Sequence, residues 1–78
     1  MDLHLNLLLI DAQTRLDRGM MALYANRIFG DGGAFEHYEN SVEIFESLIA
    51  QNEVGAMHIP LCMMAVHACS FMSVCYEK

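Results

Sequence analysis

The stretch VGAMHIPLCMMAVHACSFMSVCY, residues 54–76, contains no aspartate, glutamate, lysine or arginine. Wound as an α-helix at about 100° per residue, it has no polar side. A helix that is apolar all round has to be covered by its own chain, by partner chains or by lipid. The stretch therefore predicts a helix over residues 57–76 that needs cover from the rest of the chain or from another molecule.

The chain is short and unusually apolar. Its 78 residues allow one domain, residues 1–78, and a chain of this length buries only about 60% of its unfolded surface. Yet 55% of the residues are hydrophobic and 18% are charged, which is more apolar surface than a small domain can hide. Seven methionines, which suit adaptable contact surfaces, point the same way. We expect a single all-helical domain whose surplus apolar surface is buried between subunits.

The cysteines and the first residues bear on the compartment. Cys62, Cys69 and Cys75 lie on one predicted helix, and an odd number on one rigid element forms no disulfide framework. The opening residues lack the basic segment and the small-residue cleavage site of a secretory signal. Both observations lead us to expect a cytoplasmic protein.

The first predicted helix, residues 3–28 with Asp2 as its N-cap, carries two apolar stripes. One stripe consists of Leu5, Leu9, Ala12, Leu16, Met20 and Leu23, and the opposite one of Leu3, Leu7, Ile10, Met21, Ala25 and Ile28. A helix with two stripes packs against two things, of which one can be the third helix. The predicted oligomer interface combines Leu3, Leu7, Ile10, Met21, Ile28, Met63, Met64 and Phe71. The alternative to an oligomer is a tight monomer that contains this long helix. Gly19 lies inside the helix, where glycine is unfavourable, and is therefore expected to mark a close helix crossing.

The second predicted helix, residues 35–52, is amphipathic and acidic. Its apolar stripe is formed by Tyr38, Val42, Phe45 and Ile49. Opposite the stripe lie Glu36, Glu39, Glu43 and Glu46, which we call the acidic face. Residues 29–57 hold the whole net charge of −6, because the acidic and basic residues balance on either side. The acidic face is predicted to bind a basic surface of another protein, and the alternative is a face that is merely solvated. For the helix itself, the alternative is a start only at Ser41.

Candidate chemistry is sparse. His58, Cys62 and Cys69 fall along one strip of the third helix, but Cys62 and Cys69 are two turns, about 10 Å, apart. One ion could not bind both thiolates without further ligands, so we expect no metal and no cofactor, with the cysteines packed as small hydrophobes. His67 is expected at an interface. No arrangement of a nucleophile with a base is present, so an enzyme is not expected.

A membrane span is a further reading of residues 54–76, since about 20 uncharged residues cross a bilayer. His58, Pro60, His67, Ser70 and Ser73 interrupt the run, and Lys78 is its only basic flank. These residues favour an oligomer core over a membrane span.

The sequence thus predicts an all-α helical-bundle oligomer, a homodimer or larger, of three helices at 3–28, 35–52 and 57–76. Functionally we expect a small acidic, non-enzymatic protein-interaction module that inhibits or modulates another macromolecule. Phage inhibitors and anti-activators offer a class-level analogy, and a nucleic-acid mimic is one version. Direct nucleic-acid binding is not expected at this net charge. The alternatives are a small-ligand- or metal-binding helical oligomer and a membrane-associated small protein.

Overall fold

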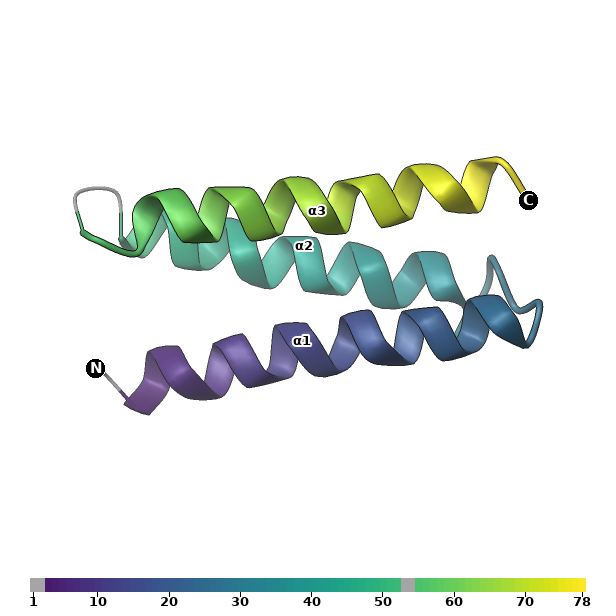
Figure 1. The fold of residues 1–78 in the computed structure, drawn as a ribbon. Coiled ribbons are helices and arrows are strands. Elements are labelled where there is room, and N and C mark those ends of the chain that lie inside the picture. The colour runs from purple at the N-terminus through teal and green to yellow at the C-terminus, as the bar shows by residue number, and fades with distance from the viewer. Residues whose placement is uncertain (1–2, 53–54) are drawn as a thin grey trace.

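The computed structural model describes residues 3–52 and 55–78, which form three α-helices. These are α1 (Leu3–Tyr24), α2 (Ala34–Gln51) and α3 (His58–Tyr76). The helices run alternately up and down, and α2 lies between the other two (Figure 1). It packs along both α1 and α3, whereas α1 and α3 hardly contact each other. The predicted all-α, three-helix fold is confirmed.

The order of the helices corrects one expectation. The α1 stripe that contains Leu5, Ala12 and Leu16 packs on α2 and not mainly on α3. The fully buried large side chains come chiefly from α2, with Tyr38, Phe45 and Leu48, and α3 contributes Leu61. The acidic helix is therefore the centre of the core along its apolar side, and the charge-free helix is an outer layer. An amphipathic helix can take this central place because α1 and α3 both approach its apolar side.

Small residues on α1 decide how closely α2 approaches. A Cβ atom on Gly19 would lie 2.4 Å from Cε1 and 2.7 Å from Cδ1 of the Tyr38 ring. Further along the same crossing, the Ser41 hydroxyl donates a buried 3.0 Å hydrogen bond to the Ala12 carbonyl oxygen. Tyr38 and Ser41 are both fully buried. The expected close helix crossing at Gly19 is thus present, and it joins α1 to α2.

The first helix ends earlier than predicted, at Tyr24 and not at residue 28. Asn26 adopts a left-handed conformation with φ of 60°, its N–H donates to the Leu23 carbonyl, and the Arg27 N–H donates to the Ala22 carbonyl. This pair of bonds is the Schellman termination, which asparagine can form as well as glycine. The helix therefore stops four residues before its predicted end at residue 28.

The other helix bounds lie close to those predicted. α2 begins at Ala34, so the alternative start at Ser41 is wrong. In its first turn the Ala34 N–H donates to the Arg27 carbonyl, and the Phe35 N–H donates to the Ile28 carbonyl. α3 begins at His58, one residue later than predicted. The predicted N-cap, Asp2, lies outside the described residues.

An aromatic cluster fastens the end of α3 to the α1–α2 connection. The rings of Phe29, Phe35 and Tyr76 lie in mutual contact, with centroids 5.4–5.7 Å apart. Such pairs stabilise by about 0.5–1.5 kcal/mol beyond the area they bury. The cluster holds the last turn of α3 against the start of α2.

Two buried titratable groups lie in the core, and they make stability sensitive to alkali. Burial raises the pKa of the Tyr38 phenol above its ordinary value of 10.0, and the nearby Cys75 and Tyr24 add to the rise. Burial likewise raises the pKa of the Cys75 thiol above 9.0, opposed by a backbone hydrogen bond. Above these ordinary values the unfolded chain has released protons that the folded chain still holds, so stability falls as pH rises.

We therefore expect the urea midpoint to fall progressively from about pH 9 upward, where the unfolded thiol and phenol ionise. Tyr38→Phe should flatten the part of this fall above about pH 10. At neutral pH the same variant should keep or gain stability, because the buried Tyr38 hydroxyl has no hydrogen-bond partner among the described residues. Leu7→Ala, at an exposed position on α1, is the control and should keep the wild-type pH profile. A wild-type midpoint that is flat to pH 10.5 would contradict this account.

Candidate interaction surfaces

The acidic face lies on the solvent side of α2. Glu36, Glu39, Glu43 and Glu46 are all exposed. Within residues 3–52 and 55–78 no lysine or arginine forms an ion pair with any of them. One weak internal contact is present, a 3.4 Å hydrogen bond from the Gly32 N–H to Glu36. The carboxylates are therefore available to an external cation.

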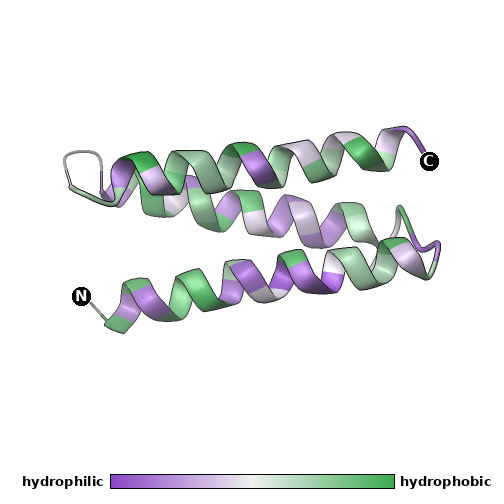
Figure 2. Cartoon of the chain, viewed as in Figure 1, coloured by the Kyte–Doolittle hydropathy of each residue, from purple (hydrophilic) through white to green (hydrophobic). Residues whose placement is uncertain are grey.

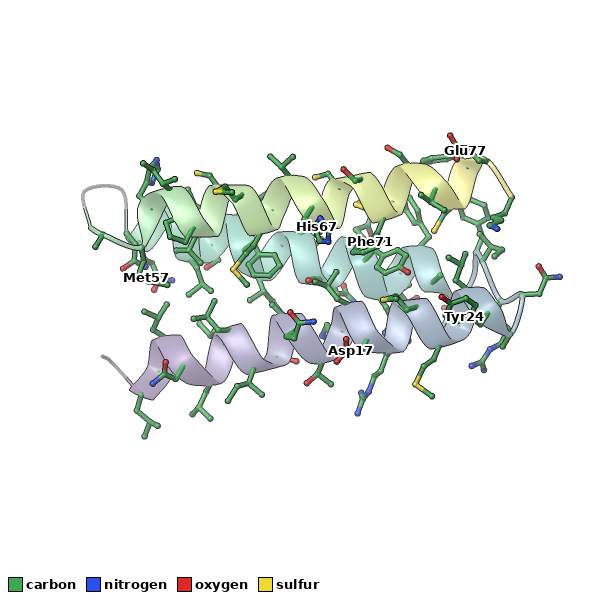
Figure 3. All side chains as sticks on the ribbon, viewed as in Figure 1. Asp17, Tyr24, Met57, His67, Phe71 and Glu77 are labelled. Atoms are coloured by element: carbon green, nitrogen blue, oxygen red, sulfur yellow. The ribbon has the colours of Figure 1, made fainter. Side chains whose placement is uncertain are left out.

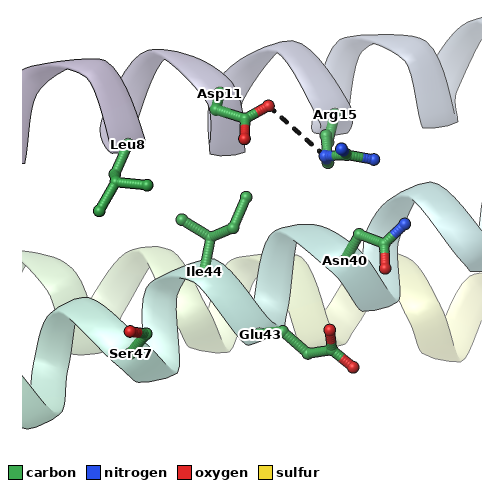
Figure 4. Close-up of a pocket in the computed structure, with 7 residues that line it drawn as sticks. All are labelled: Leu8, Asp11, Arg15, Asn40, Glu43, Ile44 and Ser47. Atoms are coloured by element: carbon green, nitrogen blue, oxygen red, sulfur yellow. Dashed lines mark ion pairs between the residues drawn. The ribbon is translucent and has the colours of Figure 1, made fainter.

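A cleft of about 370 Å³ lies beside the acidic face, between α1 and α2. Figure 4 shows Leu8 and Ile44 facing each other across it and Glu43 at its edge. At the α1 side Arg15 pairs with Asp11, with Nε 3.5 Å from Oδ1. This pair is internally neutral, so Glu43 supplies the net charge of the cleft. The cleft can hold a long side chain that has an apolar stem and a cationic end.

The surface of α3 turned away from α2 is apolar and open. Figure 2 shows apolar residues along most of α3, whereas polar and apolar residues alternate along α1. Ile59, Met63, Val66 and Tyr76 are between 67% and 72% exposed. The buried side of the helix is narrow, formed by Leu61, Ala68 and Cys75 at seven-residue spacing. The chain itself therefore leaves most of its charge-free helix uncovered.

By length and composition, the 19-residue α3 could also cross a membrane. Core helices of soluble proteins can have the same length and composition, but they are mostly buried. Here 17% of an 18-residue stretch of α3 is buried within the chain. An exposed apolar surface of this kind is typical of contact with another molecule.

Between α1 and α3 lies a smaller apolar groove of about 270 Å³, lined by Leu16, Met63 and Met64 together with Gln13 and His67. His67 and Phe71 lie on the α3 side that is turned toward α1 (Figure 3). The His67 ring meets Phe71 edge-on at 4.8 Å between centroids, and Phe71 stacks on Tyr38 at 5.3 Å. The contacting rings of His67, Phe71 and Tyr38 therefore connect α3 to the point where α1 and α2 cross at Gly19.

The predicted oligomer-interface residues fall into two groups. Leu3, Leu7, Ile10, Met21 and Met63 are exposed. Ile28, Met64 and Phe71 are half-buried and pack against the core of their own chain. The first group lies on the outer sides of α1 and α3, so these two surfaces, and not the half-buried residues, are open to a partner.

The metal candidates do not form a site within one chain. Cys62 Sγ lies 3.8 Å from His58 Nε2, one helical turn away, but Cys69 is exposed further along α3. Among the described residues no group of three or more histidine, cysteine or acidic side chains could hold an ion. The expectation that the cysteines pack as core residues is right for Cys75, which is buried, and wrong for Cys69, because that position faces away from α2.

Comparisons with protein-family models, with curated proteins and with solved structures return no match for this chain. The surfaces themselves therefore carry the functional inference. Of these, the cleft at Leu8, Ile44 and Glu43 was not predicted from the sequence, because it depends on the register between α1 and α2. The spacing of Asp11 and Arg15, one helical turn apart, indicates their pairing but not the cleft beside it.

Proposed function

We propose that this protein is a small, non-enzymatic interaction module that binds a basic surface of another protein through the acidic face and the adjoining cleft, and so modulates that protein. The observation that carries the proposal is the unpaired row of four exposed glutamates on α2. The opposite side of the same helix is occupied by α1 and α3, so this row is the side of α2 left for a partner.

The charge layout supports the proposal energetically. Exposed carboxylates contribute little to folding, so stability alone does not require them to cluster. Clustered charge accelerates and orients the encounter with an oppositely charged partner. The cleft adds specificity, because a lysine or arginine of the partner can lay its stem on Leu8 and Ile44 while its cationic end meets Glu43.

The test reverses charge on the acidic face. Glu39→Lys combined with Glu43→Lys raises the net charge from −6 to −2 and should leave helicity unchanged, because both positions are exposed. A protein captured from lysate by the wild type is identified, and its association rate is measured by surface plasmon resonance. We expect the double variant to bind at least about tenfold more slowly. The wild-type rate should also fall between low and physiological salt.

A matched control separates the acidic face from net charge. Asp31→Lys combined with Glu77→Lys makes the same change in net charge at exposed positions outside the face. This control should keep most of the wild-type association rate. Binding by the Glu39/Glu43 variant that is as fast and as tight as that of the wild type would reduce the acidic face to a solvated surface.

A further inference from the structure

A regular seam runs along the open surface of α3. Ile59, Cys62, Val66, Cys69, Ser73 and Tyr76 follow one another at alternating spacings of three and four residues. At about 100° per residue these positions fall within one side of the helix. All of them except the half-buried Cys62 are exposed. Spacing of this kind is how helices present a continuous line of side chains to a second helix.

We propose that this α3 seam pairs with the α3 seam of a second copy of the chain, forming a two-fold symmetric dimer. The inference is independent of the proposed function, because the seam and the acidic face lie on different helices. α3 carries no charged residue, so two such surfaces meet without bringing like charges together. A charged partner would form no ion pair with this surface, whereas a second copy presents the same uncharged, apolar surface.

The exposed area agrees with a dimer. Ile59, Val66 and Tyr76 of the seam are each about two-thirds exposed, as is Met63, which lies one turn from Ile59 on the same side of α3. Together with the smaller seam side chains they present on the order of 500 Å² per chain, against about 800 Å² per partner in a standard interface. Pairing the two seams then removes on the order of 1,000 Å² in total, the lower end for a specific interface. The small side chains of Ser70 and Ser73 lie among them and allow the helix backbones to approach closely.

The packing of α3 favours a second copy over a lipid bilayer. α3 lies lengthwise against α2, and the solvent side of α2 carries the four glutamates of the acidic face. To cross a bilayer α3 would have to leave α2, which would expose the part of α2 that α3 covers, including the face of Tyr38 stacked on Phe71. Pairing with a second α3 covers the seam while every contact within the chain is kept.

The test measures mass by light scattering after size-exclusion chromatography, at about 50 μM chain. We expect the wild type at twice 8.8 kDa and Val66→Glu at the mass of one chain, with helicity by circular dichroism unchanged. Ala50→Glu places the same new charge on the acidic side of α2 and should remain a dimer. In a chain that retains Cys69 as its only cysteine, a short bismaleimide should give a covalent dimer, whose yield falls at least tenfold with Val66→Glu.

Three results would overturn the proposal. The first is a wild type with the mass of one chain. The second is a dimer that survives Val66→Glu but is lost in Leu7→Glu, which would place the interface on the outer side of α1. The third is a single chain that floats with phosphatidylcholine vesicles through the same seam, shown by loss of flotation in Val66→Glu, which would assign the surface to lipid.

Discussion

Replacing Gly19 with alanine is expected to lower the free energy of unfolding by about 1–2 kcal/mol, and replacing it with valine by about 2–3 kcal/mol. Alanine is the better helix former by up to about 1 kcal/mol, so helix propensity alone predicts the opposite sign. Sterics decide the outcome, because a Cβ atom would lie 2.4 Å from a Tyr38 ring atom. The ring has little room to move, since it is fully buried and stacked on Phe71. Urea denaturation measures the change.

A double-mutant cycle isolates this contact. In a Tyr38→Leu background the ring is absent, so Gly19→Ala should be neutral or should stabilise by up to about 1 kcal/mol. The change of sign is the signature of a steric clash at the crossing. If Gly19→Ala stabilises the wild type as well, α1 and α2 do not approach as closely as the Gly19–Tyr38 contact requires.

Leu61→Ala is expected to cost about 2–5 kcal/mol, a large part of the roughly 4–12 kcal/mol typical of a chain of this size. Leu61 is 0% exposed and is the largest of the three buried side chains that hold α3 on α2. Ala68 and Cys75, the other two buried residues of α3, are too small to fill the cavity. Thermal unfolding followed by circular dichroism measures the loss.

Leu7→Ala is the matched control, because it makes the same chemical change at a position that is 57% exposed on α1. Its cost should stay within about 0.5 kcal/mol. Hydrogen exchange adds a second measurement: Leu61→Ala should speed exchange of the α3 amides more than those of α1. Equal costs for the two leucine variants would mean that α3 is not held through Leu61.

The sequence was a good guide to the helices and a poor guide to their order. Periodicity placed Tyr38 and Phe45 on the inner side of α2 and the four glutamates on its outer side, as the structure has them. A helix that is apolar all round has to pack against other apolar surfaces, but its sequence does not show which helix packs against it. The spatial order of the helices depends on how their surfaces fit together. The small residues Ala12 and Gly19 allow α2 to approach α1 closely.

The end of α1 and the cleft show two other limits of sequence reasoning. Asn26 ends the helix because its left-handed conformation closes the Schellman bonds, whereas the apolar stripe that contains Ala25 and Ile28 predicted a longer helix. The cleft at Leu8 and Ile44 arises where two helices meet in a particular register. No spacing within either helix encodes that register, so the acidic face was predictable and the cleft beside it was not.

The placing of α2 between α1 and α3 has a consequence for how the chain reaches its native state. Each helix packs against its neighbour in the sequence, so the contact order is low, and helical proteins of low contact order fold in microseconds to milliseconds. The α1–α2 hairpin, with its crossing at Gly19, contains its own buried contacts and can form before α3 packs against it. α3, whose outer side is apolar and exposed, is made after α1 and α2, so its buried side meets a surface that is already formed.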